Sequence, residues 1–348
     1  MTAPLRSAPL KVGFVGCGGV AQVVHLPILS QVEEVELVAL CDVDLRKATV
    51  LGDKFGVPHC YGDVEEMVTR HQLDLVFVLT PNNLRMPISM MVLRHNAHLF
   101  LEKPAGLNQA EVARIATEAR QRNLHVMVGM QNRFRSDVRS IKTFLDAQEV
   151  GEVFYGRSEW LQSKFPVQKQ PWVFKKKIAG GGVVMDLGLP LIDMVWWLIG
   201  KPAVRSVRAY QHPIKKDLEV EDFCVFTLEF DNHFTLLAEV SWDFPTGRDS
   251  LSVELVGSAG TCKLNPLRIQ KLWRGQLLNI TPELRENSTT IFRKSYENEI
   301  RHYVNFLLGK VSNLESSIED AVHVMGMVDM IYRSLATGKE VRAEHAVE

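Results

Sequence analysis

Three small residues near the N-terminus have the spacing of a phosphate-binding turn. Gly16, Gly18 and Ala21 form the pattern G-x-G-x-x-A directly after an apolar run, Val12 to Val15, that predicts a buried strand. The first glycine permits a tight turn, the second lets a pyrophosphate approach the backbone, and the alanine lets the following helix pack closely. The pattern alone is weak, because turns are glycine-rich in many proteins. The residues predicted to contact a dinucleotide here are Gly16, Gly18, Gly19, Val20 and Ala21.

An acidic residue follows at the place expected of a ribose ligand. Asp42 ends a second predicted strand that begins at Val35. A carboxylate there accepts hydrogen bonds from both adenosine ribose hydroxyls and repels a 2′-phosphate, which favours NAD over NADP. Arg46 could pair with that phosphate, so NADP stays open. In the alternative interpretation, Asp42 or Asp44 only caps the next helix.

The elements that must position these residues alternate between strand and helix. Apolar runs predict strands at 73–81, 98–106 and 124–130, and helical patterns cover 45–55, 64–71, 84–95 and 108–122. Gly56 is a helix stop, and Asn108 with Glu111 forms a capping box. This alternation predicts a doubly wound parallel sheet, whose ligands bind beyond the carboxyl ends of the strands. The residues at those ends include Thr80, Pro81, Asn82, Glu102, Lys103, Pro104, Asn132 and Arg133.

Three motifs together carry a family resemblance. GCGGVA at 16–21, TPNN at 80–83 and EKP at 102–104 resemble the Gfo/Idh/MocA family of nicotinamide-dependent oxidoreductases, over nearly the whole chain. The resemblance implies that Lys103 is an active-site lysine near the nicotinamide and the substrate hydroxyl. It also implies that Thr80, Pro81, Asn82 and Glu102 flank or support the cofactor. A lysine held by neighbours in a dry site can move a proton; the alternative is a surface lysine paired with Glu102.

Two positions depart from the family pattern. The family often has a histidine five residues after the threonine of its T-P-N motif, and Arg85 stands there, which is expected to alter the nicotinamide side of the site. The family's catalytic helix resembles G-G-G…D-x-x-x-H-x-x-D. Asp186 and Asp193 match its acids, but Pro190 replaces its histidine.

Pro190 cannot transfer a proton, and it belongs in a first helical turn, so we expect this helix to begin near Gly188. Three alternatives remain for the proton transfer. Lys103, with or without Asp186, carries the proton; another side chain that enters the site carries it; or the redox step is lost. Asp186 is predicted to contact the substrate or the lysine, with a helix cap as the alternative. Asp193 is expected to be structural.

The second half of the chain predicts a large, mainly antiparallel sheet. Strands are expected at 151–163, 203–213, 223–230, 233–244, 251–264 and 267–280, with a hairpin turn at Asp231-Asn232 and closing helices near 296–308 and 317–335. Lys175, Lys176 and Lys177 are either a solvated face or anion ligands. Phe165, Trp172 and Phe174 are expected to pack their loop. Family members, by the resemblance, pair such sheets into homodimers or homotetramers.

Composition limits the class of protein. The chain has 348 residues, 46% of them hydrophobic, with a formal net charge of −1, which predicts about two soluble globular domains. Nothing in this balance favours nucleic acid or a membrane surface. The N-terminus lacks the apolar core of a signal peptide. Five scattered cysteines without a C-x-x-C pair argue against a metal site and favour the cytoplasm.

The combined prediction is an α/β enzyme with two domains. Residues 8–130 form a Rossmann domain, and residues 131–342 form an α+β domain for substrate binding and oligomerisation. The reaction is reversible hydride transfer between NAD(P) and a sugar, cyclitol or related small polar alcohol. Lys103, Arg133, Asp186 and Pro190 are predicted to line the substrate site, with Lys103 and Asp186 catalytic. The alternatives are a nucleotide-binding sensor without redox activity, favoured by Pro190, or an NAD-dependent lyase or glycosidase that recycles its cofactor. A reductase that takes its proton from solvent or from the substrate also remains open.

Overall fold

The computed structural model describes residues 8–165, 171–215, 217–245, 247–284 and 286–343, in two compact units. The first unit contains Met1–Gln131 and Phe292–Val322, and the second contains Asn132–Ile291 and His323–Glu348. The expected boundary near residue 130 matches the end of the first segment. Residues 292–322, however, were expected in the second domain and instead pack with the first unit.

Residues 292–322 pack with the first unit because the last strand of its sheet has a free edge that needs hydrogen-bond partners. Val128 N donates to Ser316 O at 2.9 Å, Ser316 Oγ donates to Val128 O at 2.7 Å, and Tyr303 Oη donates to His125 O at 2.8 Å. The returning segment thus covers the free edge of the first sheet, whose main-chain groups would otherwise be open to another chain.

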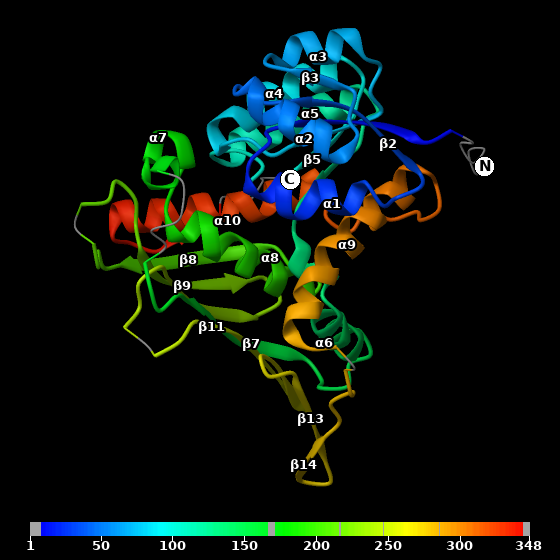
Figure 1. Ribbon diagram of the computed structural model, residues 1–348. Helices are drawn as coiled ribbons and strands as arrows, with labels where there is room; N and C mark the ends of the chain where they lie inside the picture. The colour runs from blue at the N-terminus through cyan, green and yellow to red at the C-terminus, as the bar shows by residue number, and fades with distance from the viewer. Residues whose placement is uncertain (1–7, 166–170, 216, 246, 285, 344–348) are drawn as a thin grey trace. The chain divides into compact units, whose positions relative to one another are not determined.

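The first unit is built on a six-stranded parallel sheet in the order β3-β2-β1-β4-β5-β6. Figure 1 labels β2, β3 and β5 of this sheet. Its strands are β1 (Leu10–Val15), β2 (Val35–Cys41), β3 (His59–Tyr61), β4 (Leu75–Val78), β5 (His98–Leu101) and β6 (Val126–Val128). Its helices are α1 (Leu26–Leu29), α2 (Leu45–Phe55), α3 (Val64–Arg70), α4 (Asn82–Arg94) and α5 (Gln109–Gln121). This order is that of the doubly wound dinucleotide-binding fold, so the predicted fold class is confirmed.

Local signals in the sequence act as predicted. Gly56 ends α2 in the left-handed conformation, with φ of +68°. Asn108 caps α5 by accepting a hydrogen bond from the Glu111 N–H at 3.0 Å. The Glu111 carboxylate bonds the Leu107 N–H at 2.8 Å, one residue before the position that the capping-box pattern predicts.

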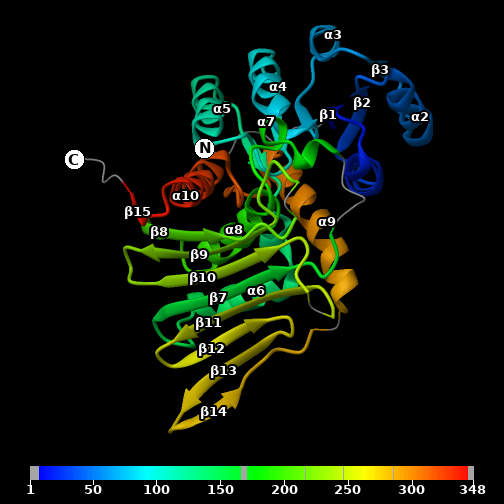
Figure 2. The same ribbon diagram turned by 90° about the vertical axis from the view of Figure 1, so that its left-hand side faces the viewer.

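The second unit contains a nine-stranded sheet in the order β14-β13-β12-β11-β7-β10-β9-β8-β15, seen broadside in Figure 2. Its strands are β7 (Val153–Leu161), β8 (Val204–Gln211), β9 (Phe223–Phe230), β10 (Thr235–Ser241), β11 (Ser250–Gly257), β12 (Gly260–Leu264), β13 (Arg268–Trp273), β14 (Gln276–Asn279) and β15 (Val341–Arg342). The β7–β10 pair is parallel and the other pairs are antiparallel. The predicted antiparallel sheet is therefore confirmed.

Helices cover one face of this sheet. They are α6 (Ser136–Asp146) and α8 (Leu189–Leu198). The short helix α7 (Lys176–Ala179) precedes α8, and α9 (Ser288–Leu307) and α10 (Ile318–Thr337) span the points where the chain passes between units. Every residue of α8 is buried. The segment Lys176–Leu198 is long and apolar enough to cross a membrane, but 83% of its apolar window is buried inside the protein, as in an ordinary core helix.

The segment that carries Asp186 becomes helical before α8 begins. The α-helix itself begins where expected, since Gly188 is the N-cap of α8 and Pro190 lies in its first turn. A π-helical turn, Val184–Gly188, precedes α8 and carries Asp186. In this wide turn the N–H of Leu189 bonds the Val184 carbonyl. Pro190 follows at the junction, where its missing N–H and its ring are tolerated because the wider turn relieves the clash that an α-helix would impose.

Two glycines let a partly buried carboxylate hold the start of this helix. Glu221 accepts hydrogen bonds from the N–H groups of Gly182 (2.9 Å) and Val184 (3.0 Å) and from the Tyr332 hydroxyl (2.9 Å). A Cβ on Gly182 would lie 2.0 Å from the Glu221 carbonyl oxygen, and one on Gly181 would lie 1.8 Å from the Tyr332 oxygen. Only glycine therefore allows this close approach.

We expect Gly182→Ala to lower the free energy of unfolding of the second unit by about 2 kcal/mol or more, because the added methyl displaces backbone rather than a flexible side chain. Urea denaturation followed by tryptophan fluorescence measures this, since all six tryptophans lie in the second unit. Gly62→Ala, whose Cβ would meet nothing within 4 Å, is the matched control. An unchanged denaturation midpoint in Gly182→Ala would contradict the packing argument.

Candidate functional site

The glycine turn after β1 has one glycine that the fold requires and two that it does not. Gly16 has φ of +98°, and a Cβ there would lie 2.9 Å from the backbone of Leu79. Gly18 and Gly19 have nothing within 4 Å of an added Cβ. Packing does not explain glycine at these two positions, whereas the approach of a ligand to the bare backbone does, so the turn fits a pyrophosphate.

Asp42 is held against this turn. Its carboxylate accepts hydrogen bonds from the N–H groups of Cys17 at 2.8 Å and Asp44 at 3.0 Å, and the side chain is only 10% exposed. Asp44 occupies the N-cap position of α2 but makes no side-chain capping bond. The capping alternative therefore does not account for either acid, and Asp42 lies where a ribose ligand of the glycine turn is expected.

The T-P-N residues lie at the end of β4. Pro81 is the N-cap of α4, and Asn82 is its first residue and is buried. Thr80 is 8% exposed, and its hydroxyl has no hydrogen-bond partner among the described residues. A buried hydroxyl left without a partner is costly, so this position also fits a ligand that supplies one.

The E-K-P residues lie beyond β5, next to β4 in the sheet. The Glu102 carboxylate is 2.8 Å from His25 Nε2 and accepts a hydrogen bond from the Lys103 N–H at 3.2 Å. Burial acts to raise the pKa of Glu102, but the hydrogen bond from His25 and the charges of His25, Arg85 and Lys103 outweigh it, so this pKa lies below its usual value. The carboxylate remains ionised beside the half-buried Lys103.

Sequence reasoning missed His25, which is fully buried in the π-helical turn Ala21–His25. Its ring packs against Phe77 and Phe100, with centroid distances of 5.6 and 5.3 Å. Nothing local links it to Glu102, which is 77 positions away in the chain. The only signal was its position one turn after the glycine pattern.

In the second unit, Asp186 is paired with an aromatic side chain. The indole N–H of Trp242 donates to the Asp186 carboxylate at 2.8 Å, and Trp242 is fully buried. Phe165 and Phe174 stack on each other at 5.2 Å and meet the Trp242 ring edge-on. These phenylalanines pack their loop as predicted, and they surround the residue that orients Asp186, which the sequence did not single out.

The structure corrects the expected role of Arg133. Its side chain is fully buried, and its guanidinium bonds both carboxylate oxygens of Asp193, with Nε at 2.8 Å. A substrate ligand needs an accessible head group, so this geometry gives Arg133 a structural role rather than the substrate contact that we expected. Asp193 is its buried counter-ion, as a structural acid should be. Breaking such a pair costs several kcal/mol because it leaves a buried charge.

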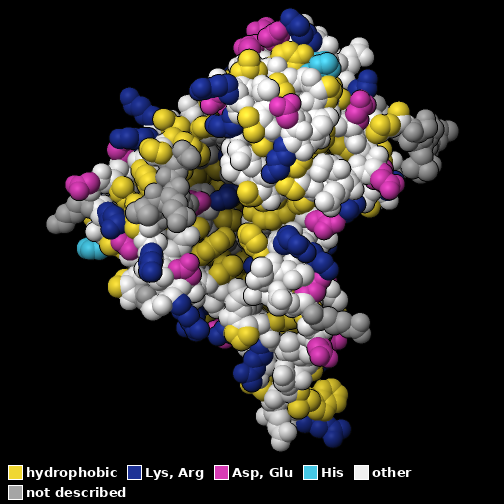
Figure 3. Space-filling model, in the orientation of Figure 1, with side chains coloured by type: hydrophobic (Ala, Val, Ile, Leu, Met, Phe, Trp, Pro, Cys, Tyr) yellow, Lys and Arg dark blue, Asp and Glu magenta, His cyan; other side chains and the backbone are white. Residues whose placement is uncertain are grey.

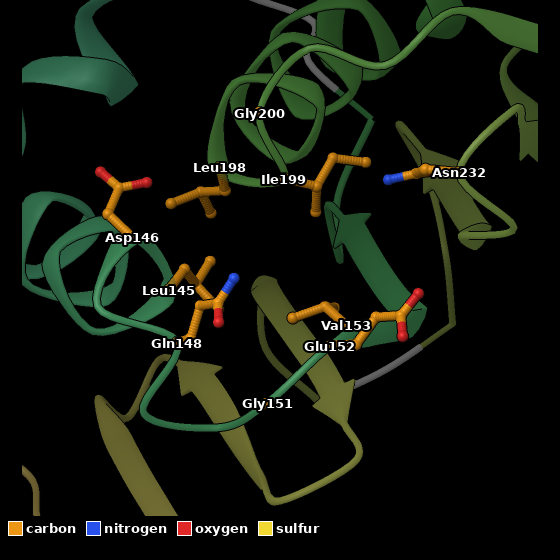
Figure 4. A pocket seen from close by; sticks show the side chains of 10 residues that line it. All are labelled: Leu145, Asp146, Gln148, Gly151, Glu152, Val153, Leu198, Ile199, Gly200 and Asn232. Atoms are coloured by element: carbon orange, nitrogen blue, oxygen red, sulfur yellow. The ribbon is translucent and has the colours of Figure 1, made fainter.

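Two other features lie apart from the predicted residues. Lys175 pairs with Glu219 at 2.7 Å on an exposed surface, which favours the solvated-face interpretation of the three lysines. A hollow of about 200 Å³ is lined by Asp146, Glu152 and Asn232 among others. Figure 4 shows these side chains near the ends of α6 and α8. It contains none of the predicted site residues. Among the described residues, no group of three or more His, Cys, Asp or Glu could hold a metal ion.

Relatives of known activity extend along the whole chain. D-glucoside 3-dehydrogenase of Escherichia coli (strain K12) is 25% identical over 364 residues, covering 98% of this chain and 99% of that protein. D-apiose dehydrogenase of Rhizobium rhizogenes is 21% identical, covering 97% and 98%. The crystal structure of GenD2 from gentamicin A biosynthesis in complex with NAD is 26% identical, with a TM-score of 0.83 and 99% coverage of each chain.

Two family descriptions match the chain in succession. Residues 10–130 match the oxidoreductase family with an NAD-binding Rossmann fold, and residues 138–263 match the GFO/IDH/MocA C-terminal domain. The resemblance carried by the GCGGVA, TPNN and EKP motifs is thereby confirmed. The chain belongs to the Gfo/Idh/MocA family of oxidoreductases, and its first unit contains the NAD-binding Rossmann fold of that family.

Proposed function

We propose that this protein is an NAD-dependent dehydrogenase that acts on a secondary alcohol of a sugar, cyclitol or related small polar molecule. The observation that carries the proposal is Lys103, which is held beside an ionised Glu102 at the carboxyl end of β5, the edge of the sheet where this fold binds its cofactor. The glucoside and apiose dehydrogenases among the relatives support the sugar class.

In this proposal each residue has a definite task. A bound NAD⁺ would supply the hydride acceptor for the carbinol carbon, and this chain's residues would hold it in place. Gly16, Gly18, Gly19, Val20 and Ala21 hold the pyrophosphate, Asp42 holds the adenosine ribose, and Thr80, Pro81 and Asn82 flank the cofactor. Lys103 orients the substrate hydroxyl and, as the neutral amine, takes its proton to become the ammonium, since Pro190 has no group that could do so.

Asp186 binds a substrate hydroxyl, and the hydrogen bond from the Trp242 N–H holds the Asp186 carboxylate in a fixed orientation. Pro190 is buried, so it shapes the wall behind Asp186 rather than making a polar contact. Pro190 also favours a second candidate, a nucleotide-binding sensor without turnover, because the family's usual proton carrier is missing. A lyase or glycosidase that recycles its cofactor would retain NAD through purification.

We expect the pure protein with NAD⁺ to oxidise at least one member of a panel of sugars, glucosides and cyclitols, followed by absorbance of the reduced nicotinamide. Lys103→Ala lowers kcat by about 100-fold or more, because the group that takes the proton is gone. Lys54→Ala, on the exposed face of α2, is the control. A silent wild type that binds NAD and gains turnover with Pro190→His would establish the sensor instead.

Asp42 gives a prediction that needs no substrate. Asp42→Asn keeps an oxygen that can accept from the Cys17 N–H but removes the charge that repels a 2′-phosphate. We expect NADP⁺ to gain at least about tenfold in affinity relative to NAD⁺, from a change of about 1.4 kcal/mol. Calorimetric titration with both nucleotides measures this, with the exposed Asp53→Asn as control. An unchanged ratio would remove Asp42 from the ribose site.

The outer face of the second sheet supports a homo-oligomer. On this face the half-buried side chains of Tyr155, Val225 and Leu237 lie among charged residues, and Tyr210 is 58% exposed. Figure 3 also shows hydrophobic side chains at the end of the β13–β14 hairpin, where Trp273 and Leu277 are more than half exposed. We infer a homodimer or homotetramer through this sheet. The five cysteines, none in a disulfide, fit a reducing cytoplasm.

Leu237→Glu tests the interface. A carboxylate at the centre of the outer face should dissociate the oligomer into monomers, because burying an unpaired charge is costly. Light scattering after size-exclusion chromatography measures the mass, with circular dichroism to verify folding. Val50→Glu, on an exposed position of the first unit, should leave the mass unchanged. A wild type that is monomeric at micromolar concentration would refute the inference.

A further inference from the structure

Arg85 is a buried cation that bonds main-chain carbonyls from two loops. It lies in the first turn of α4, 5% exposed. Its Nε donates to the Thr80 carbonyl at 3.0 Å, and its Nη1 donates to the Glu102 carbonyl at 2.7 Å and to the Pro104 carbonyl. One side chain therefore connects the segment after β4 with the segment after β5.

The sheet hydrogen bonds between these two segments end close to Glu102. The strands β4 and β5 are paired through Val78 and Leu101, and the Glu102 N–H still bonds the Val78 carbonyl at 3.3 Å. Beyond that point the strands end and the chain turns into loops. The guanidinium continues the connection where the sheet hydrogen bonds stop, because its planar fork can donate several hydrogen bonds at once.

The bonds of Arg85 lie on both sides of Lys103. Glu102 and Pro104, its chain neighbours, both give their carbonyls to the guanidinium. The Glu102 carboxylate in turn bonds the Lys103 N–H and faces His25 Nε2. The main chain of the lysine is thus held by one buried cation through the carbonyls and by His25 through the carboxylate.

We propose that Arg85 is a positioning residue for the reaction, which sets the main chain of Lys103 at a fixed place relative to Thr80 beside the cofactor. This inference rests on the proposed role of Lys103. These hydrogen bonds of Arg85 go to main-chain carbonyls, so the arrangement uses the guanidinium geometry in addition to the positive charge that Arg85 places near Glu102. Lysine at this position would keep the charge but reach fewer of the three carbonyls.

The first test needs no substrate. Amide hydrogen exchange, read by mass spectrometry, should become about tenfold faster in Arg85→Met over both residues 79–83 and residues 101–106, with an intermediate change in Arg85→Lys. Arg94→Met, the same change at an exposed position of the same helix, should match the wild type. Faster exchange in only one segment, or equally throughout the first unit, would overturn the proposal. If Arg85→Met does not fold, Arg85→Lys carries the test.

The second test uses the alcohol that the panel identifies. In Arg85→Met and Arg85→Lys, kcat should fall by about tenfold or more while KM changes little, because a misplaced lysine slows the chemical step. The primary deuterium isotope effect on kcat should rise, which mere loss of stability would not cause. Wild-type kcat in Arg85→Met would overturn the inference. If the wild type oxidises no alcohol, the proposed function fails, and Arg85 is judged by exchange and NAD titration: unchanged values in both would overturn it.

Discussion

The largely buried carboxylate of Glu102, whose side chain is 12% exposed, makes the interactions on which the first unit's candidate site depends. It lies at the end of β5, bonds the Lys103 N–H, and faces His25 from the helix that follows the glycine turn. Its own carbonyl accepts from Arg85, which also bonds Thr80. Glu102 and Arg85 together thereby connect the π-helical turn Ala21–His25 with the segments after β4 and β5. A buried carboxylate is stable only when donors and cations surround it, so the site's charges hold each other in place.

A second carboxylate, that of the partly buried Glu221, has the corresponding role in the second unit. Glu221 bonds the N–H groups of Gly182 and Val184 and the hydroxyl of Tyr332, and so fixes the start of the helix that carries Asp186. Burial raises the pKa of Glu221, and its hydrogen bonds oppose this only in part. The pKa of Glu102 shifts in the opposite direction, downward, because cations lie close to its carboxylate. Each carboxylate acts indirectly: it holds in place the backbone that carries a proposed site residue of its own unit.

Helices α1 and α8, which follow the segments that these two acids hold, share an unusual start. In each, a π-helical turn is followed by a proline: Ala21–His25 before Pro27, and Val184–Gly188 before Pro190. The wide turn accommodates a residue that cannot donate to the preceding turn. At Pro190 this geometry replaces the histidine that the family pattern expects. Asp186 keeps its place in the pattern, but no side chain at position 190 can carry a proton. We therefore assign the proton transfer to Lys103.

Local spacing in the sequence determined the strand and helix alternation, the glycine turn, the helix caps and the family membership, because these depend on residues within a few positions of each other. The roles of single site residues stay predictions. Tertiary structure alone decided that Arg133 is buried against Asp193, that Trp242 orients Asp186, and that residues 292–322 cover the edge of the first sheet. It also brought His25 to Glu102 across 77 positions. Hydrophobic periodicity tells which face of an element is buried, but not which distant polar group meets it there, since that depends on how the sheets and helices pack.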